Sequence, residues 1–105
     1  MAKHMLVVFA NAADGRDEEF NRWYNDVHLG DVLGIEGFVA AQRFELKGMP
    51  GADSPHRYLA LYEIETDDVD AVVERLTSSA GSMVLSDALL DPTALVATPI
   101  TERRT

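Results

Sequence analysis

The chain has 105 residues, enough for one hydrophobic core and too few for two independent ones, so we expect a single domain over residues 1–105. Apolar residues make up 47% and charged residues 26%, which excludes the composition of disordered chains. Acidic residues outnumber Lys and Arg by 18 to 9, giving a formal net charge of -9. This charge repels phosphate backbones and anionic membrane surfaces, so we expect neither nucleic acid nor membrane as a partner.

The sequence contains no cysteine. This excludes disulfides, thiolate metal ligands and thiol nucleophiles, and it fits a cytoplasmic location. The longest apolar run, residues 5–10, is far too short to span a bilayer, and residues 1–4 do not resemble the start of a signal peptide. We therefore expect a soluble cytoplasmic protein.

The first part of the chain predicts a strand, a helix and a second strand. Residues 4–10 (HMLVVFA) are apolar at both odd and even positions, as in a strand that is covered on both faces. Asp14 is a candidate cap for a helix with acidic residues in its first turn and an aromatic-rich face. This helix is expected to reach about His28 and to loosen into a short turn before Gly34. Residues 38–46 predict the next strand.

The following segment predicts a hairpin and a second helix. Residues 47–55 contain two prolines and two glycines and are typical of a loop, and residues 57–65 (RYLALYEIE) predict a third strand, antiparallel to the second. An acidic helix start at residues 66–70 then precedes an apolar stripe that includes Val69, Val72 and Leu76.

The end of the chain is less regular. Residues 83–90 are compatible with a short extra helical turn that Pro92 would end. Residues 94–100 (ALVATPI) predict a fourth strand. We expect an edge strand, because Pro99 cannot donate a hydrogen bond to a neighbouring strand.

The resulting order, βαββαβ, is that of an α+β, ferredoxin-like domain with a four-stranded antiparallel sheet and two helices on one face. Two helices cover only one side of such a sheet, yet the first strand and Leu59, Ala60 and Leu61 in the third are apolar on both sides. The simplest cover is a second copy of the sheet, packed face to face with a barrel-like interior. The sequence therefore predicts a homodimer.

Three stretches resemble a known superfamily. They are FNRWYNDVH at residues 20–28, the GF pair at 37–38 followed by Arg43 and Phe44, and YLALYE at residues 58–63. They resemble the dimeric α+β barrel proteins, particularly the EthD-like and related uncharacterised bacterial branches, over most of the chain. The resemblance implies the same ferredoxin-like fold and pairing into a dimeric barrel.

The resemblance also indicates where a site would lie. The superfamily includes polyketide cyclases, muconolactone isomerases, small cofactor-free monooxygenases and haem-degrading enzymes, among which the fold alone does not choose. Its sites generally lie in the cleft between the sheet and the helices, with an aromatic-then-histidine arrangement on the first helix. The matching positions here are Trp23, Tyr24 and His28.

His28 and Tyr24 are the candidate catalytic residues. Their four-residue spacing places both side chains on one face of a continuous helix, where they could act on one small ligand. The ordinary pKa of histidine suits acid or base chemistry near neutral pH. An equally plain reading is a structural histidine bonded to a backbone carbonyl.

The residues near His28 in the sequence are compatible with either a functional or a structural role. Trp23 is a candidate ligand contact, but a large aromatic on an apolar stripe is more simply a core anchor. Asn25 and Asp31 lie three residues to either side of His28, and either could orient its imidazole. Asp31 could equally cap the turn that follows.

Arg43 and Tyr62 are the candidate binding residues on the strands. Arg43 shares a strand face with Val39 and Ala41, so it needs a carboxylate or an anionic ligand group, and Glu63 on the next strand is the simpler partner. Tyr62 lies on the same face as Tyr58. Either tyrosine could line the cleft or fill the core.

The sequence predicts no metal site and no cofactor. His4, His28 and His56 form no close-spaced ligand pair, and no glycine-rich phosphate loop follows a strand. There is no Gly-x-Ser-x-Gly nucleophile turn either.

Three functions are compatible with these residues. The first is a cofactor-independent cyclase or isomerase acting on an apolar or aromatic metabolite, with His28 as acid or base, Tyr24 and Tyr62 holding an oxygen, and Arg43 as a secondary anion-binding group. The second is a monooxygenase-like or haem-handling protein that uses Trp23, Asn25 and His28. The third is a non-catalytic metabolite-binding or accessory dimer.

Overall fold

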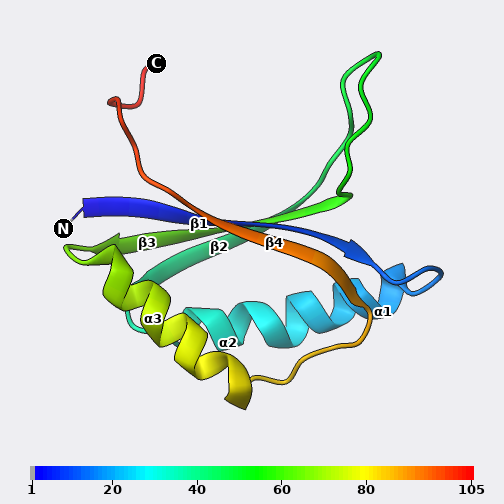
Figure 1. Cartoon of the computed structure of the whole chain (residues 1–105), viewed down its shortest axis with the longest axis horizontal. Helices are drawn as coiled ribbons and strands as arrows, with labels where there is room; N and C mark the ends of the chain where they lie inside the picture. Colours follow the sequence, from blue (N-terminus) through cyan, green and yellow to red (C-terminus); the bar gives the residue numbers. More distant parts are fainter. Residues whose placement is uncertain (1) are drawn as a thin grey trace.

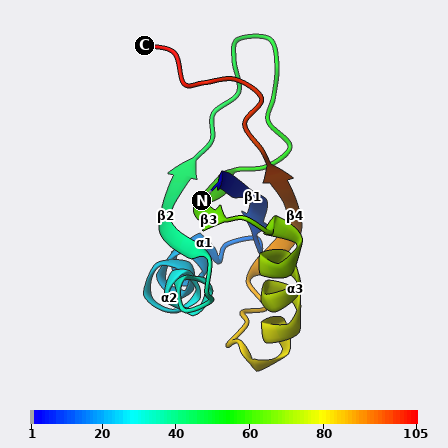
Figure 2. The same cartoon turned by 90° about the vertical axis from the view of Figure 1, so that its left-hand side faces the viewer.

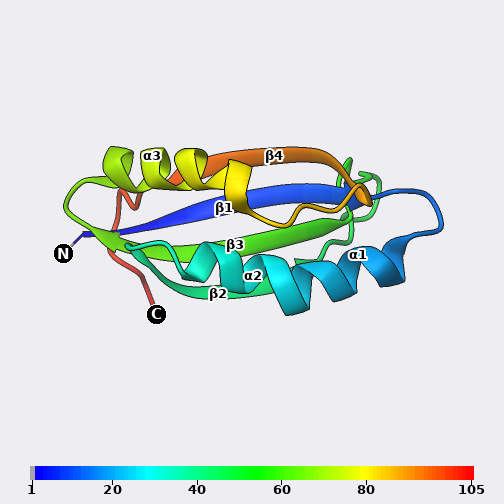
Figure 3. The ribbon, with the colours of Figure 1, turned by 90° about the horizontal axis from the view of Figure 1, so that it is seen from below.

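The computed structural model describes residues 2–105 and contains the predicted ferredoxin-like order. The elements are β1 (Ala2–Ala12), α1 (Asp17–Trp23), η1 (Tyr24–His28), α2 (Leu29–Leu33), β2 (Phe38–Glu45), β3 (Tyr58–Thr66), α3 (Val69–Ser79), η2 (Ala80–Ser82) and β4 (Leu89–Ala97). The strands form one antiparallel sheet in the order β2-β3-β1-β4. All helices lie on one face of this sheet (Figures 1 and 2). Seen from below, α1 and α2 run beneath the β2–β3 half and α3 beneath the β1–β4 half (Figure 3).

The register of the sheet determines which side chains face the helices. Leu6 of β1 stands opposite Tyr62 of β3 and Val96 of β4, so these three side chains share one face. Alternate residues of β3 follow this pattern, and Tyr58, Ala60, Tyr62 and Ile64 are all buried beneath the helices. The predicted shared face of Tyr58 and Tyr62 is therefore the helix-facing one.

The first helix is longer than the sequence predicts. Asp14 lies in the preceding turn, and the residue at the N-cap is Arg16, which makes no side-chain cap hydrogen bond. The helix does not loosen after His28, because α1, η1 and α2 follow one another without a break as far as Leu33. The middle turn, η1, is a π-helix. Such turns insert an extra residue into the helix and are common at functional sites.

A bulge in β2 changes the predicted faces of that strand. The pairing with β3 shifts between Phe38 and Ala40, so Ala41 stands opposite Tyr62 and Arg43 opposite Ala60. Phe38, Ala41 and Arg43 therefore all face the helices, whereas strict alternation separates Phe38 from Arg43. The bulge is what places the Arg43 guanidinium next to the first helix.

The C-terminal third departs from the predicted boundaries. Asp68 caps α3 by accepting a hydrogen bond from the backbone N–H of Ala71 at 3.1 Å. The helical turn expected at residues 83–90 is wrong, since the short 3-10 turn of η2 comes earlier and β4 begins at Leu89. Pro92 lies inside β4, which tolerates it as an edge strand. The edge position predicted for the last strand is confirmed, but β4 ends at Ala97, so Pro99, on which the prediction rested, lies outside the strand.

The face of the sheet opposite the helices carries apolar side chains that the rest of residues 2–105 does not cover. Its members come from all four strands and include Phe44, Val7, Leu61 and Leu95. Leu95 is 55% exposed and Phe44 37%. The β2–β3 hairpin, residues 46–57, and the C-terminal residues 98–105 both project on this side (Figure 1). We refer to this surface as the open face.

Within the described residues, no helix is both long enough and apolar enough to cross a membrane.

Candidate functional site

A cavity of about 170 Å³ lies between the sheet and the helices. Its polar side chains are Tyr24 and His28 of η1 and Tyr62 of β3. The rest of its lining is apolar and comes from β1, α2, α3 and β4, with Leu76 and Pro92 among the contributors. The structure thus brings the two candidate catalytic residues and one candidate binding residue to the same space. A largely apolar cavity with a few convergent polar groups is typical of small-molecule sites.

The π-helical turn places His28 among aromatic rings. Its imidazole stacks on Trp23 with ring centroids 4.7 Å apart and meets the edge of Tyr24 at 4.9 Å. Trp23 precedes His28 by five residues, and the wider π turn brings residues at this spacing over one another. Burial lowers the pKa of His28, and the nearby charge of Asp31 partly opposes this effect. His28 is therefore neutral at pH 7.

Two polar atoms beside the cavity lack partners. Within residues 2–105, the buried side-chain nitrogen and oxygen atoms without a hydrogen bond are His28 Nδ1 and Asp31 Oδ2. The backbone-carbonyl bond of a purely structural histidine is thus not present at Nδ1. A buried polar atom left unpaired costs about 1–3 kcal/mol, so such atoms call for a physical explanation.

Tyr62 and Tyr24 form a buried pair of hydroxyl groups. The Tyr62 hydroxyl donates to the Tyr24 oxygen at 3.2 Å. Burial raises the pKa of both tyrosines, which keeps them protonated at neutral pH. Because Tyr24 accepts from Tyr62, its own O–H is available to a molecule in the cavity. A donor that itself accepts a hydrogen bond is polarised and donates more strongly.

Arg43 lies behind Tyr24 and outside the cavity lining. Its guanidinium sits 4.4 Å from the centroid of the Tyr24 ring and donates to Asn25 Oδ1 at 2.7 Å and Asn21 Oδ1 at 2.9 Å. Burial lowers the pKa of Arg43, although arginine remains charged under ordinary conditions. The positive charge opposes the effect of burial on Tyr24 and Tyr62.

The predicted ion pair between Arg43 and Glu63 is wrong. Glu63 stands opposite Ala40 and Met5 and is exposed on the open face, whereas the bulge in β2 turns Arg43 to the helix side. Among the described residues, no carboxylate lies within ion-pair distance of Arg43.

Other predicted residues make contacts away from the cavity. The Trp23 indole N–H donates to the carbonyl of Val84 at 2.8 Å, which anchors the chain after η2. Asn25 bonds Arg43 and does not reach His28. Tyr58 donates to Asp17 Oδ2 at 2.6 Å at the start of α1.

Asn21, the second acceptor for Arg43, was not among the residues predicted from the sequence. Its spacing of four residues from Asn25 places both amides on one side of the helix and was the available signal. The contribution of α3 and β4 to the cavity lining was not predicted either, because no sequence pattern in these two segments indicates a ligand site.

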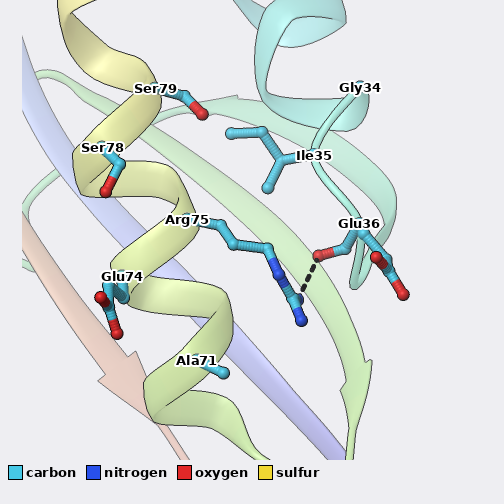
Figure 4. A pocket seen from close by; sticks show the side chains of 8 residues that line it. All are labelled: Gly34, Ile35, Glu36, Ala71, Glu74, Arg75, Ser78 and Ser79. Carbon is cyan, nitrogen blue, oxygen red and sulfur yellow. Dashed lines mark hydrogen bonds between the residues drawn. The ribbon is translucent and has the colours of Figure 1, made fainter.

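A separate hollow of about 520 Å³ runs between α3 and residues 34–36 (Figure 4). Arg75 crosses it and donates to the backbone oxygen of Glu36 at 3.2 Å. Glu36, Glu74 and Arg75 are all exposed, so the walls offer no titratable side chain in a shielded environment. This hollow lacks the features that perturb side-chain chemistry at functional sites.

The described part of the chain contains no group of three or more His, Asp or Glu side chains placed to hold a metal ion.

Comparison with solved structures identifies the class of fold. An EthD-like protein of Ralstonia eutropha JMP134 matches with 14% identity and a TM-score of 0.62, covering 98% of this chain and 96% of that one. SnoaB, a cofactor-independent oxygenase of Streptomyces nogalater, matches with 16% identity and a TM-score of 0.62, covering 96% of each chain. The heme-degrader MhuD of Mycobacterium tuberculosis matches with 16% identity and a TM-score of 0.59, covering 96% and 99%.

These similarities confirm the predicted fold class, a ferredoxin-like α+β fold with a four-stranded antiparallel sheet. At this level of identity they establish the fold and not the function. No protein-family model matches the chain, and no curated protein sequence matches it.

Proposed function

We propose that the protein binds a small, largely apolar molecule carrying one carbonyl oxygen and catalyses proton transfer on it, as in an isomerisation, without a cofactor. The observation that carries this proposal is the meeting of a neutral imidazole and a free tyrosine hydroxyl in one apolar cavity. These are the two groups that proton abstraction next to a carbonyl needs, a base and a donor to the developing oxyanion.

The chemistry divides between His28 and Tyr24. His28 takes a proton from the carbon next to the carbonyl, and the electron pair of that C–H bond moves to the carbonyl oxygen. Tyr24 donates its O–H to this oxygen, and Tyr62 supports Tyr24 through the 3.2 Å hydrogen bond. Return of the proton from His28 to a different carbon re-forms the carbonyl and gives an isomer.

The size of the cavity favours a ligand with a single ring. Sites for drug-sized ligands measure about 300–1,000 Å³, and an apolar cavity of about 150 Å³ holds benzene. The cavity of about 170 Å³ is close in volume to the one that holds benzene. Its apolar walls support a hydrocarbon ring, and its few hydroxyl groups support one oxygen substituent.

The proposal is tested with 2-cyclohexenone, a single-ring ketone, in D₂O. We expect the protein to accelerate exchange of the ring protons next to the carbonyl, measured by proton NMR. The His28→Gln variant should lose about 10²–10⁴-fold of this acceleration. His4→Gln is the matched control, because His4 bonds Thr98 outside the cavity. Equal exchange by the His28→Gln variant and the native protein would disprove the assignment of the base.

Binding without chemistry is the main alternative. Trp23 is the only tryptophan and stacks on His28, so its fluorescence reports occupancy of the cavity. A saturable fluorescence change on addition of 2-cyclohexenone, with no exchange of its protons, favours a metabolite-binding or accessory role.

An oxygenase role is the second alternative, and the fold similarity to SnoaB supports it. Proton abstraction by His28 would also begin a cofactor-free oxygenation, and oxygen uptake measured with an electrode separates the two reactions. Haem fits the residues poorly. The cavity of about 170 Å³ is small for a macrocycle, and Trp23 and Asn25 are engaged with Val84 and Arg43.

We also propose that a second copy of the chain covers the open face. A contiguous apolar sheet surface is typical of an interface, and the surrounding hairpin and C-terminal segment on the same side provide further contact area. The absence of cysteine supports a cytoplasmic location for the dimer.

A further inference from the structure

We propose that Asp31 is a positioning residue for His28, whose carboxylate accepts a hydrogen bond from Nδ1–H and leaves Nε2 free to act as the base in the cavity. The inference rests on the proposed function, because it assigns Nε2 the proton transfer. The position of the proton on the His28 imidazole can be measured whether or not a reaction is found.

The two unpartnered atoms carry this inference. His28 Nδ1 and Asp31 Oδ2 are both buried and both lack a hydrogen bond, and no other side-chain atom of residues 2–105 shares this condition. One is a potential N–H donor and the other a carboxylate acceptor, so they are complementary. They are three residues apart in one continuous helix, a spacing at which side chains are neighbours. The structure does not place the two atoms within hydrogen-bond distance, so a rotation of one side chain is needed to form the bond that satisfies both.

Among residues 2–105, no group makes a hydrogen bond to His28 Nδ1. The titratable side chains that line the cavity with His28 are Tyr24 and Tyr62, and the Tyr62 hydroxyl is directed to Tyr24. The walls from α3 and β4 are apolar. Asn25, the other candidate for orienting the imidazole, is held by Arg43.

Asp31 also borders solvent on its far side. It lines a hollow of about 350 Å³ together with Ser79 and Ser82, whereas His28 lines the inner cavity. Ser79, Gly34 and Ile35 border this hollow and the neighbouring one drawn in Figure 4. Asp31 therefore borders a space that small solutes can enter, while His28 borders the inner cavity. Removing the carboxylate opens a path by which a small carboxylate ion can replace it.

The first experiment measures the imidazole itself. Nitrogen NMR of the native protein should show His28 as the tautomer protonated at Nδ1, and Asp31→Asn should lower the pKa of His28 because a negative charge is removed. Asp26→Asn is the matched control, since Asp26 is exposed on the same helix and should leave this pKa unchanged. A native imidazole protonated at Nε2, or a pKa insensitive to Asp31→Asn, overturns the proposal.

The second experiment uses proton exchange and chemical rescue. Asp31→Ala should slow the exchange of 2-cyclohexenone about tenfold or more, and added formate should restore part of the rate. Formate should not affect the native protein or Asp26→Ala. A loss of rate in Asp31→Ala that formate does not repair indicates a structural role and contradicts the proposal. If the native protein shows no exchange, the proposed function fails, and the NMR result still decides the role of Asp31.

Discussion

Removal of the Tyr62 hydroxyl tests whether Tyr24 acts as a polarised hydrogen-bond donor. Tyr62→Phe removes the 3.2 Å hydrogen bond and leaves the ring that packs beneath the helices. We expect the exchange rate to fall about tenfold and the free energy of unfolding to drop by about 1 kcal/mol. Tyr58→Phe is the control, since its hydroxyl bonds Asp17 outside the cavity. An unchanged rate in Tyr62→Phe would show that Tyr24 acts alone.

The lowered pKa of His28 predicts a particular pH dependence. A base must be deprotonated, so the rate should rise with pH, with its midpoint below the ordinary histidine pKa of about 6.5. The free energy of unfolding also depends on the protonation of His28. Below pH 6.5 the unfolded chain binds a proton that the folded protein resists, so this contribution to stability is lost as pH falls toward the folded pKa. His28→Gln should flatten this part of a plot of melting temperature against pH.

At the scale of single residues, the sequence predicted that His28 and Tyr24 lie together, but it did not predict the partners of Arg43. His28 and Tyr24 belong to one helix, so their spacing was sufficient to bring them together. The partner of Arg43 depends on a bulge in β2, and strict alternation therefore assigned it to Glu63. No spacing pattern in the sequence reveals such a bulge.

The junction between α2 and β2 is tightly constrained at Gly37. Gly37 has a φ of +108°, and an added Cβ would lie 2.7 Å from Val72 Cγ2 of α3. Gly37→Ala should lower the free energy of unfolding by about 2–4 kcal/mol in urea titrations, because it combines backbone strain with overpacking. Gly15→Ala is the control, as Gly15 has a φ of +73° and free space around it, so only the backbone strain should remain.

The elements show why boundaries were harder to predict than their order. Apolar spacing of three and four residues fits an α-helix and a π turn equally well, so η1 was not predicted from it. Asp14 has a side chain suited to an N-cap, but it lies in the turn two residues before Arg16, which occupies the N-cap position. The strands and α3 carried stronger signals, and their order was predicted correctly.

The open face leads to a prediction for the whole molecule. Leu61 lies on this face in β3, opposite Val7. Leu61→Glu should convert the proposed dimer into a monomer, measured by light scattering at micromolar concentration, because it buries unpaired charges in the interface. Leu85→Glu is the control, since Leu85 is 61% exposed in the segment after η2. A native protein that has the mass of one chain would rule out the dimer.

The position of β1 at the centre of the sheet affects how the chain acquires its structure during synthesis. β1 is made first, but its partners β3 and β4 come from the second half of the chain, and Leu6 pairs with Val96, 90 positions later. At about 5–20 residues per second, the apolar strand waits roughly 2–10 s for β3 alone to emerge. Pairing between distant segments also slows folding relative to helical proteins. The apolar side chains of β1 therefore stay uncovered by their sheet partners until β3 and β4 have been made.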